Sequence, residues 1–155
     1  MKLIVKQNQR LRCERGQTLV EFALLVPVLL LLIFGAIEFG RVFHATHVIT
    51  SAAREGARAA AVHKGNTEIA DKVKDAASSL VDPSNVIIKD NSAYQNTQPA
   101  VNQVIFTIDK YDLSQRDVGE VTIKIKTKIK IIVPIINSIL GNEKVISSEA
   151  VMRLE

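Results

Sequence analysis

The chain has 155 residues, 47% of them hydrophobic, with 20 Lys and Arg against 16 Asp and Glu. This length suits one small domain beside other segments. Its single cysteine, Cys13, excludes an internal disulfide and a site built from several thiolates. No glycine-rich phosphate loop or nucleophile-elbow motif occurs, so we expect no catalytic residues, no cofactor and no enzymatic activity.

The positive charge is concentrated in a leader, residues 1–16, which holds five basic residues and one acid. Without residues 1–16, the chain has 15 basic and 15 acidic residues, so residues 17–155 are formally neutral. The chain therefore lacks the large basic surface of a nucleic-acid-binding protein. We expect no nucleic-acid partner.

An apolar run follows the leader. Residues 22–37 are 16 apolar residues, and counting 19–21 gives 19, which at 1.5 Å per residue is about 28 Å, close to the thickness of a bilayer core. We predict a membrane-spanning helix over 17–40, with the basic N-terminus in the cytoplasm and the remainder across the membrane. A conventional secretory signal is the competing interpretation, but 35–37 and 45–47 match its cut site poorly.

Glu21 stands at the mouth of this run. A carboxylate there is costly unless a positive group meets it. Cutting after Gly16 would free the α-amine of Gln17, four residues before Glu21 and on the same helix face. The Glu21 of a neighbouring subunit is the alternative partner for that amine. The pattern predicts a processed, self-assembling helix, in which Pro27 either frees a carbonyl for use or is a tolerated kink.

A helical stem is predicted over residues 41–65, where no proline interrupts the chain. Small residues recur at Ala52, Gly56 and Ala60, a spacing that lets another helix or a sheet approach closely. The alternative is an alanine-rich helix with a solvated charged side. Glu38 and Arg41 are expected to pair at the outer end of the span.

Two histidines on this stem, His44 and His47, have a spacing that allows a shared metal ion. A metal site normally needs a third or fourth ligand, and no carboxylate or cysteine is placed to supply it. We expect no metal site and interpret the pair as part of an interfacial helix face.

Residues 66–155 are predicted to form an extracytoplasmic α+β domain. A helix over 67–80, capped by Asn66 or Thr67, is followed by short strands and a polar loop around 91–99. The predicted strands are 85–89, 101–109, 121–132 and 145–154.

Apolar residues alternate with Thr and Lys in 121–132, which predicts an antiparallel sheet with one face on the core and one in water. The lysine row has a second interpretation, contact with lipid headgroups or a partner. Pro134 is expected to end this strand. The short amphipathic turn after it would lie on the sheet or point toward the membrane.

The stretches RGQTLVEFALLVPVLLLLIFGAIEFGRVFH, SAAREGARAAAV and the ending SSEAVMRLE resemble the TadE-like family, pseudopilins of the tight-adherence (Flp) branch of type IV pilus systems. The resemblance implies a pilin-like fold and cleavage by a prepilin peptidase between Gly16 and Gln17, with Glu21 at the fifth mature position. Gln17 replaces the phenylalanine common in the wider superfamily, and glutamine is usual in this branch.

The resemblance also implies a function, a minor pilin or pseudopilin that takes part in assembling a thin adhesive pilus. The implied partners are the peptidase, other pilins and the assembly platform. The implied location is the bacterial cytoplasmic membrane, with a single pass and the C-terminal domain outside. The residues assigned to assembly or helix packing are Glu21, Phe22, Pro27, Ala52, Gly56 and Ala60.

Two other functions stay open at this point. A type II-like secretion pseudopilus would use the same helix chemistry, so the sequence does not separate it from a surface pilus. A membrane-anchored binding module would use residues 17–40 as an anchor only. That module predicts no cleavage at Gly16 and tolerance of Glu21→Gln.

Overall fold

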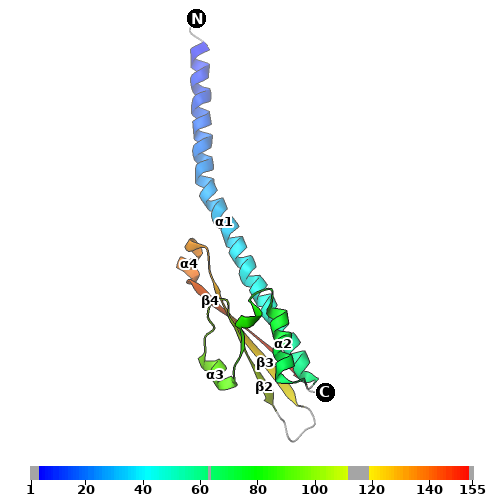
Figure 1. The fold of residues 1–155 in the computed structure, drawn as a ribbon. Helices are drawn as coiled ribbons and strands as arrows, with labels where there is room; N and C mark the ends of the chain where they lie inside the picture. The colour runs from blue at the N-terminus through cyan, green and yellow to red at the C-terminus, as the bar shows by residue number, and fades with distance from the viewer. Residues whose placement is uncertain (1–3, 63, 112–118, 154–155) are drawn as a thin grey trace. The chain divides into compact units, whose positions relative to one another are not determined.

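The computed structural model of the chain describes residues 4–62, 64–111 and 119–153 (Figure 1). It divides into two compact units, Met1–Ile37 and Glu38–Glu155. The boundary between the units falls within one helix, α1 (Ile4–Ala61). The α+β class with a long N-terminal apolar helix is confirmed.

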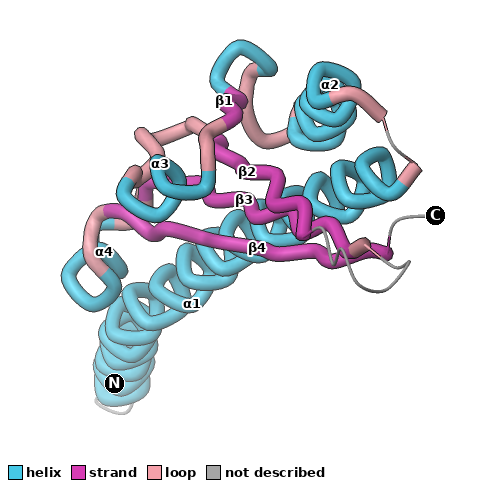
Figure 2. Tube along the Cα trace, turned by 90° about the horizontal axis from the view of Figure 1, so that it is seen from below, coloured by secondary structure: helices cyan, strands magenta, loops and turns pink. Residues whose placement is uncertain are grey.

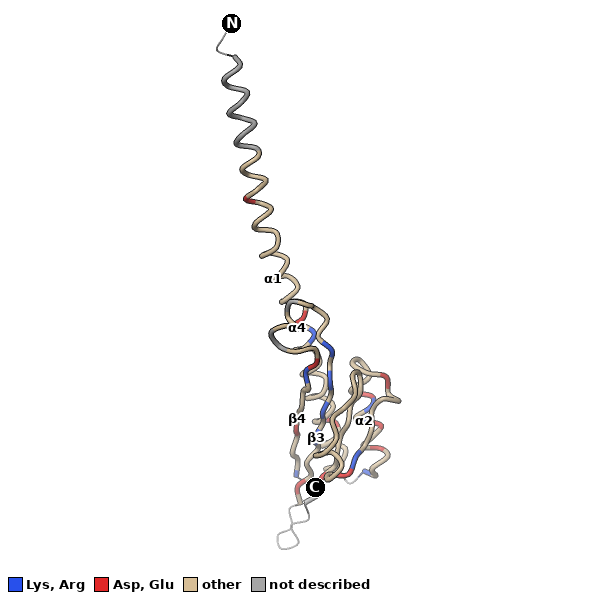
Figure 3. Tube along the Cα trace, turned by 90° about the vertical axis from the view of Figure 1, so that its left-hand side faces the viewer, with Lys and Arg blue, Asp and Glu red and all other residues tan. Residues whose placement is uncertain are grey.

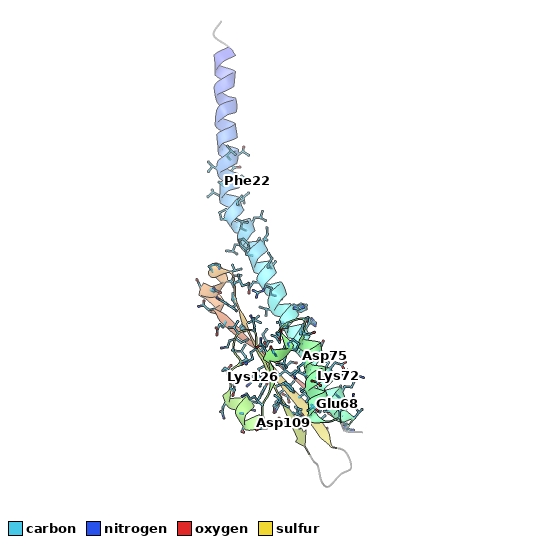
Figure 4. All side chains as sticks on the ribbon, viewed as in Figure 1. Phe22, Glu68, Lys72, Asp75, Asp109 and Lys126 are labelled. Atoms are coloured by element: carbon cyan, nitrogen blue, oxygen red, sulfur yellow. The ribbon has the colours of Figure 1, made fainter. Side chains whose placement is uncertain are left out.

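The first unit is helical, and its apolar side chains are exposed (Figure 4, where Phe22 is labelled). None of residues 16–37 is buried. Among the described residues, α1 is the one helix whose length and composition suit a membrane span. Pro27 lies inside it, and α1 continues through this position.

The second unit begins with the remainder of α1, residues 38–61, here called the stem. Its buried positions recur every three or four residues and include Ala45, Ile49, Ala52, Gly56 and Ala60. This spacing marks one face of a helix packed on a core. The helix ends at Ala61, before the predicted end of the stem at residue 65.

Helix α2 (Asn66–Ala77) follows and buries Ile69, Val73 and Ala77. The predicted cap is wrong, because Gly65 takes the N-cap position in an extended conformation and no side chain caps the helix. The Gly65 carbonyl instead accepts the Ile69 amide at 3.0 Å. A short 3-10 turn, η1 (Pro83–Asn85), then leads into the sheet.

Four strands form one sheet in the order β1-β2-β3-β4 (Figure 2). Strands β2 and β3 are antiparallel, as are β3 and β4, in agreement with the prediction. Strand β1 runs parallel to β2, so the sheet is mixed. Parallel neighbours need a long crossover, and residues 89–103 provide it. The strand bounds are β1 (Val86–Ile88), β2 (Val104–Tyr111), β3 (Glu120–Lys130) and β4 (Glu143–Arg153).

The core lies between the helices and one face of this sheet. The stem, α2 and the inward side chains of β2 and β3 form one apolar cluster, in which Phe106, Ile123 and Ile125 are fully buried. Gly56 of the stem lies against this cluster. A Cβ added there would lie 2.7 Å from Val73 Cγ2 and 3.5 Å from Ile123 Cγ2. Glycine is therefore required for the stem to approach α2 this closely.

Helix α3 (Asn91–Asn96) lies in the crossover and contacts β2. The predicted polar loop over 91–99 is therefore wrong in its first part. Tyr94 of α3 is 3% exposed. Lys126 Nζ lies 4.2 Å from the centroid of its ring and donates a hydrogen bond of 3.4 Å to its backbone carbonyl.

The prediction that the lysine row of β3 faces open water is wrong for Lys124, Lys126 and Lys128, which are half-buried. Lys124 pairs with Asp109 at 3.1 Å, and Lys128 pairs with Glu143 at 3.1 Å. Figure 4 shows Lys126 and Asp109 on this part of the sheet. The row is covered because α3 and neighbouring carboxylates meet it.

The first prediction concerns Gly56→Ala. The added methyl must displace Val73, so we expect a loss of about 1–3 kcal/mol of unfolding free energy. Gly40→Ala is the matched control, because nothing lies within 4 Å of its added Cβ and alanine favours a helix interior by up to about 1 kcal/mol. Chemical denaturation of the detergent-solubilised protein, monitored by circular dichroism, measures the unfolding free energy of both variants. Equal shifts for the two variants would contradict the packing described.

The second prediction uses the pH dependence of stability. Burial, then the charges of Glu149 and Asp109, raise the pKa of Tyr94 from 10.0 to about 12. The folded protein thus holds this proton more tightly than the unfolded chain, and Tyr94 should reduce stability progressively as pH rises from about 10 to about 12.

The contribution of Tyr94 is measured by comparing the unfolding midpoints of the wild type and Tyr94→Phe at pH values from about 9 to about 12, roughly the range set by the two pKa values. Lysine titration is common to both proteins, so their difference reports Tyr94. We expect the wild type to lose more stability than the variant across this range. Parallel curves would show that α3 does not bury the phenol.

Candidate functional site

The predicted processing residues lie together near the start of the apolar stretch of α1. The Gln17 side-chain amide donates a hydrogen bond of 3.2 Å to Glu21 Oε1. This contact confirms that positions 17 and 21 share a helix face, as the four-residue spacing predicted. A Cβ added to Gly16 would meet nothing within 4 Å.

Phe22 and Pro27 lie on the same exposed part of α1, and the Phe22 side chain is 64% exposed. Pro27 has no backbone N–H, so it donates nothing to the carbonyl four residues earlier. Both side chains are free to meet lipid or another helix. Their part in assembly stays a prediction.

The three small residues of the stem have a different environment. Ala52 and Ala60 are fully buried, and Gly56 is buried beside Val73 of α2 and Ile123 of β3. The sequence allowed either a helix or a sheet as their neighbour. The structure provides both from the same chain, so this surface of the stem is used within the molecule.

Glu38 and Arg41 form the predicted pair at the start of the stem. Arg41 Nη1 donates to both carboxylate oxygens of Glu38, at 2.9 and 3.2 Å. The Glu38 side chain is 4% exposed, although a carboxylate of this kind is usually exposed.

The pair also reaches the end of β3, which the sequence analysis missed. Arg41 Nη2 donates to the Lys130 carbonyl at 3.4 Å, and the Ile132 amide donates to Glu38 Oε2 at 3.4 Å. We call these four residues the exit clamp. In the sequence, the one sign of this clamp was Glu38, the acid that directly follows the apolar run.

One of the two histidines, His47, makes an aromatic contact. The His47 ring meets the Phe43 ring edge to face, with centroids 4.4 Å apart. Over residues 4–62, 64–111 and 119–153, no group of three or more His, Cys, Asp or Glu side chains is placed to hold a metal ion. The described geometry offers His44 and His47 no further ligand.

The exit clamp generates the third prediction. Arg41→Met leaves the buried Glu38 carboxylate with the weak Ile132 contact, so we expect a loss of about 3 kcal/mol, the low end for a broken buried pair. Arg58→Met is the matched control: its pair with Glu55 has the same i,i+3 spacing, but the side chains are 70% and 44% exposed. The control should cost less than about 1 kcal/mol.

Denaturation under one set of detergent conditions compares the two variants. Replacing both members of the clamp, Glu38→Met with Arg41→Met, should recover most of the loss because no charge then remains buried. Similar losses for Arg41→Met and Arg58→Met would show that the clamp does not hold the stem to β3.

One comparison with known proteins gives a match. Residues 16–58 match the family model described as TadE-like protein. No curated protein and no solved structure matches the chain. The matched range begins at Gly16, contains Glu21 and the exposed apolar part of α1, and ends in the stem. Residues 16–58 are therefore similar to the TadE-like family, which confirms the resemblance seen in the sequence.

Proposed function

We propose that this chain is a minor pilin or pseudopilin of a tight-adherence pilus, cut after Gly16 by a prepilin peptidase. One observation carries the proposal: the TadE-like match begins at Gly16 and covers a helix with exposed apolar side chains and with Glu21 on the face of Gln17. The chain spans the cytoplasmic membrane once, and its C-terminal unit lies outside.

Cleavage changes the charge at the start of the helix. It creates an α-amine on Gln17, which is largely protonated near pH 7 because its ordinary pKa is about 8. The new helix N-terminus also carries the positive end of the helix dipole. Glu21, one turn away, then has a cationic partner that the uncut chain lacks at this position.

Assembly uses the same pair between subunits. In the bilayer an unpaired Glu21 is costly, so packing beside a helix that offers an amine lowers the free energy. The exposed Leu, Ile and Phe side chains around it interdigitate at the same time. Cleavage also removes the leader, whose net charge of +4 holds the N-terminus on the cytoplasmic side.

The stem gives the assembled subunit a fixed outer part. Its buried face belongs to the core of the second unit, and the exit clamp joins it to the end of β3. The outer domain is therefore carried with the helix when a subunit moves.

The fourth prediction separates cleavage from assembly. Intact mass and N-terminal sequencing of the protein from its native membrane should show a chain that begins at Gln17. Gly16→Ala should block the cut without a structural effect, since its Cβ meets nothing. Gly40→Ala, equally unhindered, is the control and should still be cut.

Glu21→Gln should be cut normally but should fail to support surface fibres seen by electron microscopy. Glu68→Gln, another exposed carboxylate, should support them. A chain that keeps Met1 would contradict the proposal and leave α1 as an anchor. Normal cleavage with fibres unaffected by Glu21→Gln or by deletion of the protein would point instead to a secretion pseudopilus.

A further inference from the structure

The connection between β3 and β4 is unusually apolar for an exposed segment. It covers residues 131–142 and contains helix α4 (Pro134–Leu140). Ile132 is 63% exposed, Pro134 is exposed, and Val133 and Ile136 are half-exposed. The core of the second unit therefore leaves several apolar side chains of this segment uncovered.

The exit clamp fixes the place of this connection. The Ile132 amide contacts Glu38, and Arg41 contacts the Lys130 carbonyl, at the point where the stem begins. Glu38 directly follows Ile37, the last residue of the apolar run. The connection thus lies beside the residues at which the proposed membrane span ends (Figure 1 shows α4 at this end of β3 and β4).

Aromatic side chains mark the same level of the stem. Phe39 is 70% exposed and Phe43 is 55% exposed, and their rings stack with centroids 6.2 Å apart. Exposed Phe side chains just beyond an apolar span provide apolar area of the kind that helices at a membrane surface bury in the boundary between headgroups and acyl chains. They place the headgroup layer at residues 38–43, the height of the exit clamp.

The charges around the connection suit anionic lipid. Lys130 and Lys144 are exposed. The acids at this end are engaged, Glu38 by Arg41 and Glu143 by Lys128. Figure 3 shows the basic positions that follow one another along β3 toward α4. Apolar side chains flanked by basic ones are the pattern of an interfacial membrane contact.

We propose that the β3–β4 connection lies in the outer headgroup layer of the membrane and gives the outer domain a second lipid contact beside α1. This inference rests on the proposed function, because it needs α1 to span the bilayer. The occupant of the apolar surface is lipid, because Ile132 contacts Glu38, the residue that follows the span in sequence, and exposed lysines flank the connection. Leaving the membrane during assembly then requires release of both contacts.

Fluorescence quenching by nitroxide lipids tests the inference. Cys13→Ser first removes the native cysteine. Three variants of this protein then each carry one new cysteine, Ser138→Cys in α4, Ile33→Cys in the span or Thr67→Cys beyond the stem, and each cysteine is labelled with the same dye. The full chain is reconstituted in phosphatidylethanolamine–phosphatidylglycerol vesicles with nitroxide in the headgroups or deep in the acyl chains. The stem from residue 38 to 61 separates Thr67 from the membrane by about 35 Å along its axis.

We expect headgroup nitroxide to quench the dye at position 138 several-fold more than the dye at position 67. Acyl-chain nitroxide should quench position 33 most. Quenching at 33 with equal, weak quenching at 138 and 67 would overturn the inference and leave the membrane span intact. Absence of quenching at 33 would remove the span itself, and with it both the inference and the proposed function.

A pair of variants adds a second test. Ile132→Asp should lower the quenching at position 138 toward the level at position 67. Val151→Asp on β4 should leave it unchanged, although Val151 is similarly exposed at 53%. Equal effects of the two variants would overturn the inference. The inference would also be overturned if nitroxide lipids did not quench the dye at position 138 and the dye became less accessible to water as the protein-to-lipid ratio rose. The surface would then be covered by another protein.

Discussion

One unbroken helix has to satisfy two different environments, and the rest of the molecule depends on where it changes from one to the other. None of residues 16–37 of α1 is buried, whereas Glu38 is buried and buried residues recur every three or four positions from Ala45 onward. Moving each large apolar side chain out of water is worth about 1.5–3 kcal/mol. The exposed half is therefore strongly driven into lipid or against other apolar helices.

The second half of the helix depends on small residues. Alanines and Gly56 let the stem lie close to α2 and β3, and the core of the outer domain forms around that contact. The exit clamp then holds the end of β3 beside the point where the helix changes its surroundings. The first half of the helix thus has large exposed side chains, which suit contact with lipid or neighbouring subunits. The second half has small buried residues, which attach the helix to the outer domain.

Much of this could be predicted because it follows from periodicity. The apolar run, the small-residue spacing of the stem and the alternation in β3 identify α1 and the antiparallel pairing of β2, β3 and β4. The shared face of Gln17 and Glu21 follows from helix geometry in the same way. In each case the residues that matter are close in sequence.

The features that sequence reasoning missed are contacts between distant segments or elements without a periodic pattern. Helix α3 is short and mostly polar, and its place over the sheet is shown by the burial of Tyr94 and by the contacts of Tyr94 with Lys126. The parallel pairing of β1 depends on how the crossover folds. The contact from Ile132 to Glu38 joins residues 94 positions apart, and no local rule reveals it.

The central claim is that the surroundings of α1 change between Ile37 and Phe43. A nitroxide scan over residues 22–48 in vesicles, with oxygen and a water-soluble nickel complex as competing relaxants, measures this most directly. The account predicts oxygen-dominated relaxation up to Ile37, then access to the nickel complex on the exposed face and protection at Ala45. Access of the nickel complex to Leu25 and Leu29 as free as at Phe43 would contradict it.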